Sequence, residues 1–350
     1  AHLFDAATGA LIRTFDDPTV TGSDNFGGAV DLAGNLVLIG APGDSTAGFL
    51  SGQAHLFDAS TGALLHTFTD PTGTGDRFGL AVAVDGNQVL IGDPADGTVF
   101  FQVGQAHVFD ATTFVLIRTL VDPTPTTVDF FGSAVDLQDN QALVGAQNDS
   151  TLINQGGQAY LFDATTGALI QTYDDPTPDD FANFGRAVAI DGNEVLIGAD
   201  FDGSGEAHLF NASTGALLET FSDPTPTMGD QFGIAVALLE GDRVLIGAAL
   251  DDTEGSNVGQ AHVFDSSDGS LMQTIDHPSP TTIDTFSVAV AMDAERLVIG
   301  AENDDDAGTN VGRVYTFLEP SLVPIPLPGA LGLAVLLAAA GLRAVRAARP

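Results

Sequence analysis

The sequence predicts an all-β protein, specifically a β-propeller built from four-stranded antiparallel blades. The first observation is an internal repeat, because the tag "AHLFD" or a close variant recurs at intervals of 48–54 residues. Repeats of this length are typical of arrays of one supersecondary unit. The tag is marked by an aromatic residue or histidine at His2, His55, His107, Tyr160, His208, His262 and Tyr315.

The second observation is that each repeat contains four short apolar runs in a fixed order. In one unit they are "FGLAVAV" (78–84), "NQVLIG" (87–92), "GQAHVFD" (104–110) and "VLIRTL" (115–120). Each run is bounded by Gly, Asp, Asn or Pro and is too short for a helix, so each is expected to be a strand. The first two runs are apolar on both faces, as in strands covered by neighbouring sheets. The fourth mixes polar and apolar residues, as exposed edge strands do. This gradient from buried to exposed strand is typical of a propeller blade.

The turns within each unit fit the same interpretation. The "DGN" of residues 85–87 predicts a tight hairpin, because Gly accepts positive φ. The "DASTGA" of residues 58–63 predicts a longer hairpin with Gly62 in the left-handed conformation. An Asp-Pro pair then follows the fourth strand, for example Asp70-Pro71, and Pro ends strand pairing because it has no N–H to donate.

The strand count predicts the number of blades. Residues 1–15 supply a third and a fourth strand, and residues 286–317 supply a first, second and third. Five complete units lie between them, at residues 26–68, 78–120, 131–173, 184–221 and 232–275. We predict seven blades in the parent protein, with two strands of the first blade and one strand of the last lying before Ala1. A six-bladed ring is the alternative, in which residues 10–15 complete the sheet of residues 286–317 and residues 1–5 are left over.

Composition restricts the function. The chain has 47 acidic and 10 basic residues and a net charge of -37, so it is expected to repel nucleic acid and anionic lipid. Such acidity can attract divalent cations or basic partners, or only keep the protein soluble. No cysteine is present, which excludes disulfides, zinc-thiolate sites and thiol nucleophiles. The opening "AHLFDAATGA" shows no signal peptide and starts inside a repeat, so we expect the parent protein to begin earlier.

The units, of the form "FGxAVxxxGNxVLIGAP", resemble the FG-GAP repeat of integrin α-subunit propellers and bacterial surface proteins. The resemblance covers about residues 1–318 and implies a β-propeller with a binding or adhesive role outside the cell. "GAP" itself stands at residues 40–42. "FG" stands at Phe26, Phe78, Phe131, Phe184 and Phe232, and becomes "FS" at Phe286.

Calcium-binding units of this family carry a DxDxDG-type loop between the FG strand and the GAP strand. Here that interval is short in every unit, as in "AVDGNQ" (83–88), and offers fewer oxygens than calcium requires. The acidic loops after the second strand are the alternative place for an ion, and no other cofactor is expected. Calcium could bind there to Asp200, Asp202 and Glu206, or to Asp304 and Asp306, although solvated loops with Asx turns explain the same residues.

The other repeated polar residues have structural explanations. Histidines at equivalent positions of different blades point away from one another, and Tyr160 and Tyr315 replace two of them. The position therefore requires an aromatic body with a polar tip. His66 and His277 have no evident partner, and no catalytic set stands out. A hydrogen bond that braces the loop accounts for the Asp two residues before the FG phenylalanine, at Asp24, Asp76, Asp129, Asp230 and Asp284.

The composition changes after the last predicted strand. Residues 319–328 form a Pro-rich linker, and residues 329–350 are expected to form a short apolar helix with an Arg-rich end. The uncharged stretch 327–342 is shorter than the roughly 20 residues of a typical membrane span. The basic flank would remain cytoplasmic and place the propeller outside. That flank consists of Arg343, Arg346 and Arg349.

The same tail resembles the PEP-CTERM class of bacterial sorting signals in its VPLP-like variant, with Val323, Pro324 and Pro326 in the motif. The resemblance implies recognition by an exosortase-like enzyme, cleavage near the motif and release to the cell surface or its polysaccharide matrix. A plain C-terminal membrane anchor is the alternative.

We therefore expect a secreted or cell-surface propeller that binds a surface polysaccharide or a protein ligand without catalysis. A surface hydrolase acting on glycans or phospholipids at the mouth of the propeller channel is the alternative. Acids or histidines converging on the central axis would favour the hydrolase.

Overall fold

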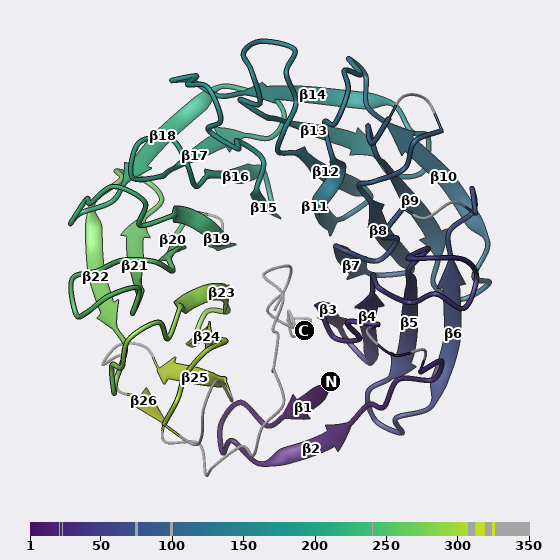
Figure 1. The fold of residues 1–350 in the computed structure, drawn as a ribbon, viewed down its shortest axis with the longest axis horizontal. Helices are drawn as coiled ribbons and strands as arrows, with labels where there is room; N and C mark the ends of the chain where they lie inside the picture. The colour runs from purple at the N-terminus through teal and green to yellow at the C-terminus, as the bar shows by residue number, and fades with distance from the viewer. Residues whose placement is uncertain are drawn as a thin grey trace, which may run out of the picture.

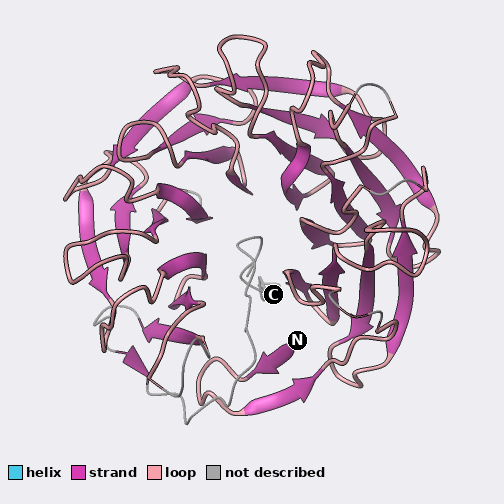
Figure 2. Ribbon diagram, in the orientation of Figure 1, coloured by secondary structure: helices cyan, strands magenta, loops and turns pink. Residues whose placement is uncertain are grey.

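The computed structural model describes residues 1–20, 22, 24–73, 76–98, 101–239, 241–306, 312–318 and 324–325. Every regular element in this part of the chain is a β-strand, which confirms the all-β class (Figure 2). The expected helix at residues 329–350 and its three arginines lie outside the described residues. No helix among the described residues is long and apolar enough to cross a membrane.

Six four-stranded antiparallel sheets are arranged as blades around a central axis (Figure 1). We number them 1 to 6 along the chain, each with its strands in sequence order from the axis outward. The innermost strands are β3 (Ala29–Ala33), β7 (Val82–Asp85), β11 (Phe131–Gln138), β15 (Ala187–Asp191), β19 (Phe232–Leu239) and β23 (Phe286–Met292). The second strands are β4 (Leu36–Ala41), β8 (Gln88–Asp93), β12 (Gln141–Ala146), β16 (Glu194–Ala199), β20 (Arg243–Ala248) and β24 (Arg296–Ala301). The third strands are β5 (Gln53–Asp58), β9 (Gln105–Asp110), β13 (Gln158–Asp163), β17 (Glu206–Asn211), β21 (Gln260–Asp265) and β25 (Arg313–Leu318). The outermost strands are β6 (Leu64–Thr69), β10 (Leu116–Val121), β14 (Leu169–Asp174), β18 (Leu217–Ser222), β22 (Leu271–Asp276) and β26 (Pro324–Ile325).

A two-stranded sheet of β1 (His2–Phe4) and β2 (Leu11–Thr14) lies beside blade 1, between it and blade 6 (Figure 1). Arg13 of β2 donates hydrogen bonds to the carbonyl oxygens of Ser60 and Thr61 in blade 1, at 2.5 and 2.9 Å. Arg118 of β10 makes the corresponding contact with Thr165 of blade 3 at 3.0 Å. The first two strands therefore contact blade 1 as the outer half of a complete blade contacts the next.

The six-bladed alternative is confirmed in its number of blades but wrong about the last blade, because residues 10–15 do not complete it. β2 pairs with β1, and β26 pairs with β25, with Thr316 opposite Ile325. β26 also takes the place of the strand that we expected to precede Ala1. The described chain thus forms a six-bladed propeller with one additional two-stranded sheet, and part of the expected linker closes blade 6.

Burial follows the order of the strands. Val89, Leu90 and Ile91 of the second strand of blade 2 are all fully buried, on both faces of the sheet. On the outermost strand of blade 1, by contrast, Leu64 and Leu65 are exposed while Phe68 is buried. The core is accordingly divided into layers between neighbouring blades, in which inward-facing side chains of two sheets pack together.

The glycines of the FG and GAP motifs allow the blades to approach this closely. A Cβ added to Gly92 would lie 2.0 Å from the carbonyl oxygen of Gly132, and one added to Gly132 would lie 2.3 Å from that of Gln105. Gly132 also has a φ of +89°. Phe131, immediately before it, forms a parallel bridge with Gly104 of the preceding blade. The FG segment of each such blade is therefore docked by its backbone on the second and third strands of the blade before it.

The tight hairpins are confirmed. Asp85 pairs with Gln88 across a two-residue turn, and Gly86 and Gly62 have φ angles of +55° and +75°. The interval in which calcium-binding relatives carry their ligands is thus only a turn in blade 2.

Gly132→Ala is expected to destabilise the protein by about 3 kcal/mol or more, because it adds a steric clash to backbone strain. Gly86→Ala is the matched control, since Gly86 also has positive φ but no atom within 4 Å of an added Cβ. It should cost only about 1–2 kcal/mol. Urea unfolding of the three proteins measures both values, and equal costs would contradict the role assigned to the blade contact.

Candidate functional site

The loops of the propeller lie at two ends of the blades. Because neighbouring strands are antiparallel, the two hairpins of each blade lie at one end. The loop between the second and third strands lies at the other end, together with the loop that enters the blade from its predecessor. We call this second end the junction face. Three positions of the repeat, acidic in most blades, fall in the loops of the junction face.

These positions define what we call the junction clusters. The first is the Asp of Asp-Pro, the second is the Asp two residues before the FG phenylalanine, and the third is the Asp four residues after the glycine of the second strand. By blade the aspartates are Asp17, Asp24 and Asp44; Asp70, Asp76 and Asp96; Asp122, Asp129 and Asp149; Asp175 and Asp202; Asp223, Asp230 and Asp251; and Asp284 and Asp304.

The side chains of several junction clusters converge. Among the described residues, one ligand atom from each of three residues lies within 4.8 Å of the other two in five groups. Three groups contain only carboxylates, and two contain a histidine. The groups are Asp76, Asp93 and Asp96; Asp122, Asp129 and Asp149; Asp223, Asp230 and Asp251; Asp70, Asp93 and His107; and Asp175, Asp202 and His208.

Hydrogen bonds from the entering loop position these carboxylates, as blade 5 shows. The amide of Thr225 donates to Oδ1 of Asp223 at 2.8 Å, and the Thr225 hydroxyl donates to Oδ2 of Asp251 at 3.3 Å. The amide of Thr227 donates to Oδ2 of Asp230 at 2.5 Å. The bracing predicted for the Asp before the FG motif is therefore confirmed here, but the braced carboxylate also belongs to a cluster.

Burial strongly perturbs the acids of the clusters. Desolvation, increased by the neighbouring carboxylates, raises the pKa of Asp76 and Asp122 to about 7 and that of Asp223 to about 6. The same causes raise the pKa of Asp93 to about 10. A raised pKa means that an unpaired negative charge is unfavourable at the site, so a proton or a cation is favoured there.

The repeated histidines pack as structural residues and also border the clusters. His55, His107, His208 and His262 are fully buried, and each Nδ1 lies 3.0–3.1 Å from a threonine hydroxyl. Each ring packs against the FG phenylalanine of its own blade, with centroids 5.6–5.8 Å apart. Burial lowers the pKa of each of the four to about 4. Each Nε2 has no hydrogen-bond partner in the described part of the chain, and that of His107 lies 3.7 Å from Asp93.

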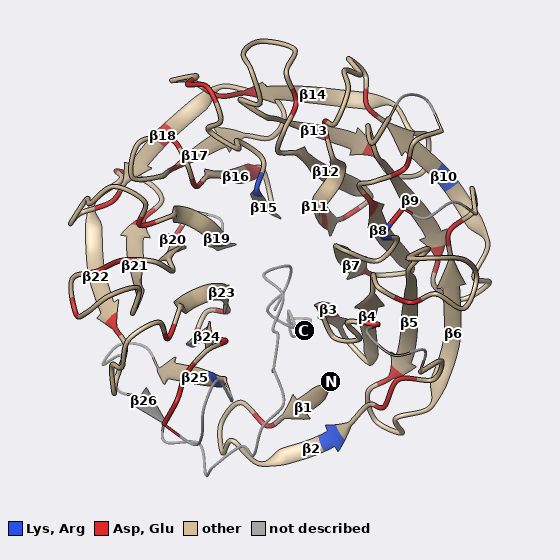
Figure 3. Cartoon of the chain, viewed as in Figure 1, with Lys and Arg blue, Asp and Glu red and all other residues tan. Residues whose placement is uncertain are grey.

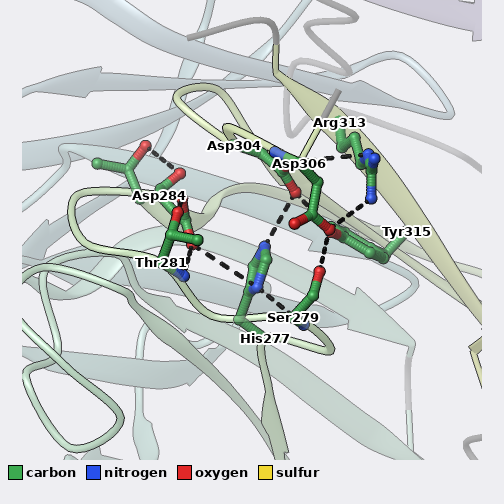
Figure 4. A network of polar contacts seen from close by, with 9 residues as sticks. His277, Ser279, Thr281, Asp284, Asp304, Asp306, Arg313 and Tyr315 are labelled. Carbon is green, nitrogen blue, oxygen red and sulfur yellow. Dashed lines mark hydrogen bonds and ion pairs between the residues drawn. The ribbon is translucent and has the colours of Figure 1, made fainter. Parts of the chain in front are cut away.

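Blade 6 differs from the others (Figure 4). His277 stands in place of the Asp before Pro, and its Nε2 lies 3.1 Å from Oδ2 of Asp304. Arg313 forms an ion pair with Asp306 at 2.7 Å and approaches Asp304 at 3.7 Å. Burial alone would raise the pKa of Asp304, but the hydrogen bonds from His277 and Tyr315 and the charge of Arg313 bring it to about 2. Nitrogen donors of protein side chains thus complete this cluster.

The five residues considered for calcium have different partners and do not form the two sites that the sequence suggested. Asp200 turns toward Arg186, at 3.9 Å, and accepts a hydrogen bond from Asn183. Asp202 and Glu206 share the hydroxyl of Thr177, at 3.1 and 3.2 Å, and so belong to the cluster of blade 4. Asp304 and Asp306, as above, have His277 and Arg313 as partners. Among the residues of the predicted sorting signal, Pro324 lies in β26 and the others lie outside the described residues.

Sequence reasoning missed the clusters because most of their members come from different loops and strands, up to 37 residues apart along the chain. It also left His277 without a partner, and the structure supplies Asp304. His66 stacks on Phe114, with ring centroids 4.4 Å apart. A signal was available in the last repeat, where Asp becomes His277, Gln becomes Arg313 and His becomes Tyr315 together.

The acids of the innermost strands serve contacts between blades. Oδ2 of Asp31 accepts the amide of Val84 at 2.6 Å, and Oδ2 of Asp136 accepts that of Ile190 at 2.8 Å. Both aspartates are buried. Within their described residues, the six innermost strands contain no histidine.

The fold and its repeated junctions define a six-bladed β-propeller. Four stretches of the chain match the family model described as "FG-GAP repeat", at residues 19–57, 117–162, 225–264 and 280–317. The first, third and fourth matches run from an entering loop to a third strand, and the second begins one strand earlier. No curated protein matches the chain.

The lowered pKa of Asp304 predicts how the stability of the protein depends on pH. A folded-state pKa below the unfolded value contributes stability that is present above about pH 4 and lost as the pH falls toward 2. Asp304→Asn should therefore lower the melting temperature near neutral pH, with an effect that shrinks as the pH is lowered to about 2.5. Thermal unfolding followed by circular dichroism measures the difference between variant and parent. A difference that stays constant with pH would contradict the ionised Asp304 assigned here.

Proposed function

We propose that the protein is a non-catalytic binding or adhesion propeller that engages its partner through the junction face. The observation that carries this proposal is a set of large apolar side chains exposed on the loops of that face. Loops between second and third strands, or between blades, present Val20, Phe49, Phe101, Leu152, Phe181, Phe201, Met228 and Ile283. Phe49 and Met228 are 83% and 98% exposed. Exposed apolar and aromatic side chains gathered on one face are typical of interaction sites.

Backbone hydrogen bonds connect neighbouring loops of this face, so that the loops form a continuous surface. The amide of Val128 donates to the carbonyl of Phe101 at 3.0 Å, and that of Phe181 donates to Asn154 at 2.9 Å. Positioned loops on a rigid scaffold are a common basis for recognition. A surface polysaccharide or a protein ligand fits such a face, because aromatic side chains stack on sugar rings and anchor protein interfaces.

The central axis gives no support to the alternative of a surface hydrolase. The buried Asp31 and Asp136 are engaged by backbone amides of the next blade. A general acid or base must instead reach a substrate proton. The charge distribution agrees with a partner other than nucleic acid, since acids are spread around the whole ring and basic residues are few (Figure 3).

We further propose that the protein acts outside the cell, secreted or attached to the surface through its C-terminus. The support is the sequence of the tail, in which a Val-Pro-Ile-Pro segment precedes an uncharged stretch and three arginines. An exosortase-like enzyme would cleave near the motif, or the apolar stretch would hold the protein in the membrane.

The binding face is tested by replacing both Phe49 and Phe101 with Ser. We expect binding to weaken at least tenfold, because truncated aromatic anchors cost about 2 kcal/mol or more each. Leu64→Thr and Leu217→Thr, on exposed outermost strands, are the control. A screen of glycans, cell walls and surface proteins, with and without calcium, identifies the ligand, and biosensor titration compares the variants. Unchanged binding by the Phe variant would place the partner elsewhere, and turnover of a glycan or phospholipid would favour the hydrolase.

The processing of the tail is tested by mass spectrometry of the mature protein from its native host. We expect a C-terminus close to Pro326. An intact Pro350 would rule out cleavage, and its recovery in the membrane fraction would support a plain anchor.

A further inference from the structure

The junction clusters contain buried polar atoms that no donor or acceptor among the described residues satisfies. Oδ2 of Asp175 and Oδ2 of Asp223 have no hydrogen-bond partner, although both aspartates are only 5% exposed. The fully buried His208 likewise has an Nε2 without a partner, and this atom is directed at the cluster of blade 4. It lies 3.6 Å from Glu206 and 3.9 Å from Asp175. Burying such groups without compensation costs several kcal/mol.

In blade 4 the loss of one acidic residue is balanced by the gain of another. Blade 4 has Ala182 where the other blades have the Asp before the FG motif, but it has Glu206 where blades 1, 2, 3 and 5 have Gln. It therefore keeps three carboxylates, those of Asp175, Asp202 and Glu206. This pattern is not explained by hydrogen bonding alone, since an amide and a carboxylate differ little in shape. It is explained if the number of negative charges around the junction matters.

Blade 6 shows what satisfies a cluster when a carboxylate is lost. Its Asp is replaced by His277, whose Nε2 and Nδ1 lie 3.1 and 3.8 Å from the carboxylates of Asp304 and Asp284. Arg313 stands at the position that is Gln260 in blade 5. Side-chain nitrogens of the protein therefore occupy the centre of this cluster, whereas the grouped ligand atoms of blades 3 and 5 are all carboxylate oxygens. In blade 3 the hydroxyl of Tyr160 also donates to Oδ2 of Asp149, at 2.9 Å.

We propose that the junction clusters of blades 2 to 5 each bind one divalent metal cation, and that His277 with Arg313 replaces the cation in blade 6.

The ligands suit a hard divalent ion. Two oxygens that bind the same calcium, at about 2.4 Å each, lie no more than about 4.8 Å apart, and the grouped atoms satisfy this limit. The grouped atoms of blades 3 and 5 are carboxylate oxygens, which calcium and manganese accept. Blade 4 adds the bare Nε2 of His208, which manganese accepts more readily than calcium.

Such ions would join the loops that build the junction face. In blade 5 the three carboxylates come from two loops, Asp223 and Asp230 before the FG motif and Asp251 after the second strand. An ion between them holds both loops in one arrangement. The inference goes beyond the proposed binding function, because it concerns the free protein and can be tested without a partner.

The first experiment measures metal content. The protein is stripped with EDTA and then dialysed against calcium or manganese, and bound metal is counted by mass spectrometry of the elements. We expect four ions per chain with the better of the two ions, and a melting temperature several degrees above that in EDTA, as ligand binding to the folded state requires. Asp223→Asn, which keeps shape but removes a charge, should lose one ion. Glu254→Gln, on the exposed part of the same blade's loop, makes the same charge change and should lose none.

The second experiment adds a site. His277→Asp combined with Arg313→Gln gives blade 6 the residues of blade 3, and we expect this variant to bind one more ion than the parent. Circular dichroism shows whether each variant is folded. The proposal is overturned if the parent retains no calcium or manganese at millimolar concentration and melts as it does in EDTA. It is overturned equally if Asp223→Asn and Glu254→Gln lose the same amount, because the ions would then belong to the acidic surface as a whole. Metal content is independent of the ligand screen, so this proposal and the proposed function can fail separately.

Discussion

The contact between the FG glycine of one blade and the GAP glycine of the preceding blade is the constraint on which the propeller depends. At Gly132 and Gly92 two backbones meet where no Cβ fits. This approach fixes the spacing of the blades and brings Phe131 into the apolar layer that they share. The one exception is informative, because Ser287 stands in the FG position of blade 6. It adopts a φ of +76°, and its hydroxyl donates to the carbonyl of Gln260 at 2.5 Å. A side chain is thus accepted only with an unusual backbone conformation and a compensating hydrogen bond.

Close blade packing has a consequence for the loops. The segment that enters a blade must pass between two loops that follow second strands, so its Asp-Pro and the Asp before FG are forced against the acid of the next loop. Carboxylates that would be exposed on a looser scaffold become buried together, as Asp223, Asp230 and Asp251 are. Two kinds of contact offset the free-energy cost of burying these carboxylates together. Threonine hydroxyls and amides bind some oxygens, and in blade 6 His277 and Arg313 supply cationic or donor groups. The remaining oxygens are what a metal ion would satisfy.

The strands and turns could be predicted because their causes are local. Alternation of apolar residues, Gly at positive φ and Pro after the fourth strand act within a few residues, so Gly62 and Gly86 were found correctly. The end of the ring was predicted less well. β26 completes blade 6 through backbone pairing of Pro324 and Ile325, and a Pro-rich segment of two paired residues has no strand pattern to recognise.

By itself, the sequence determined the repeat, the order of four strands in each blade and the burial gradient from inner to outer strand, because these follow from side-chain chemistry repeated at a fixed interval. Only the tertiary structure decided which polar residues meet. Asp175, Asp202 and His208 belong to different loops and strands of one repeat, and their convergence depends on the way the chain folds back at each blade. It also decided that His277 lies against Asp304, 27 residues along the chain. The physical reason is that strand formation depends on neighbours in sequence, whereas a buried polar cluster depends on neighbours in space.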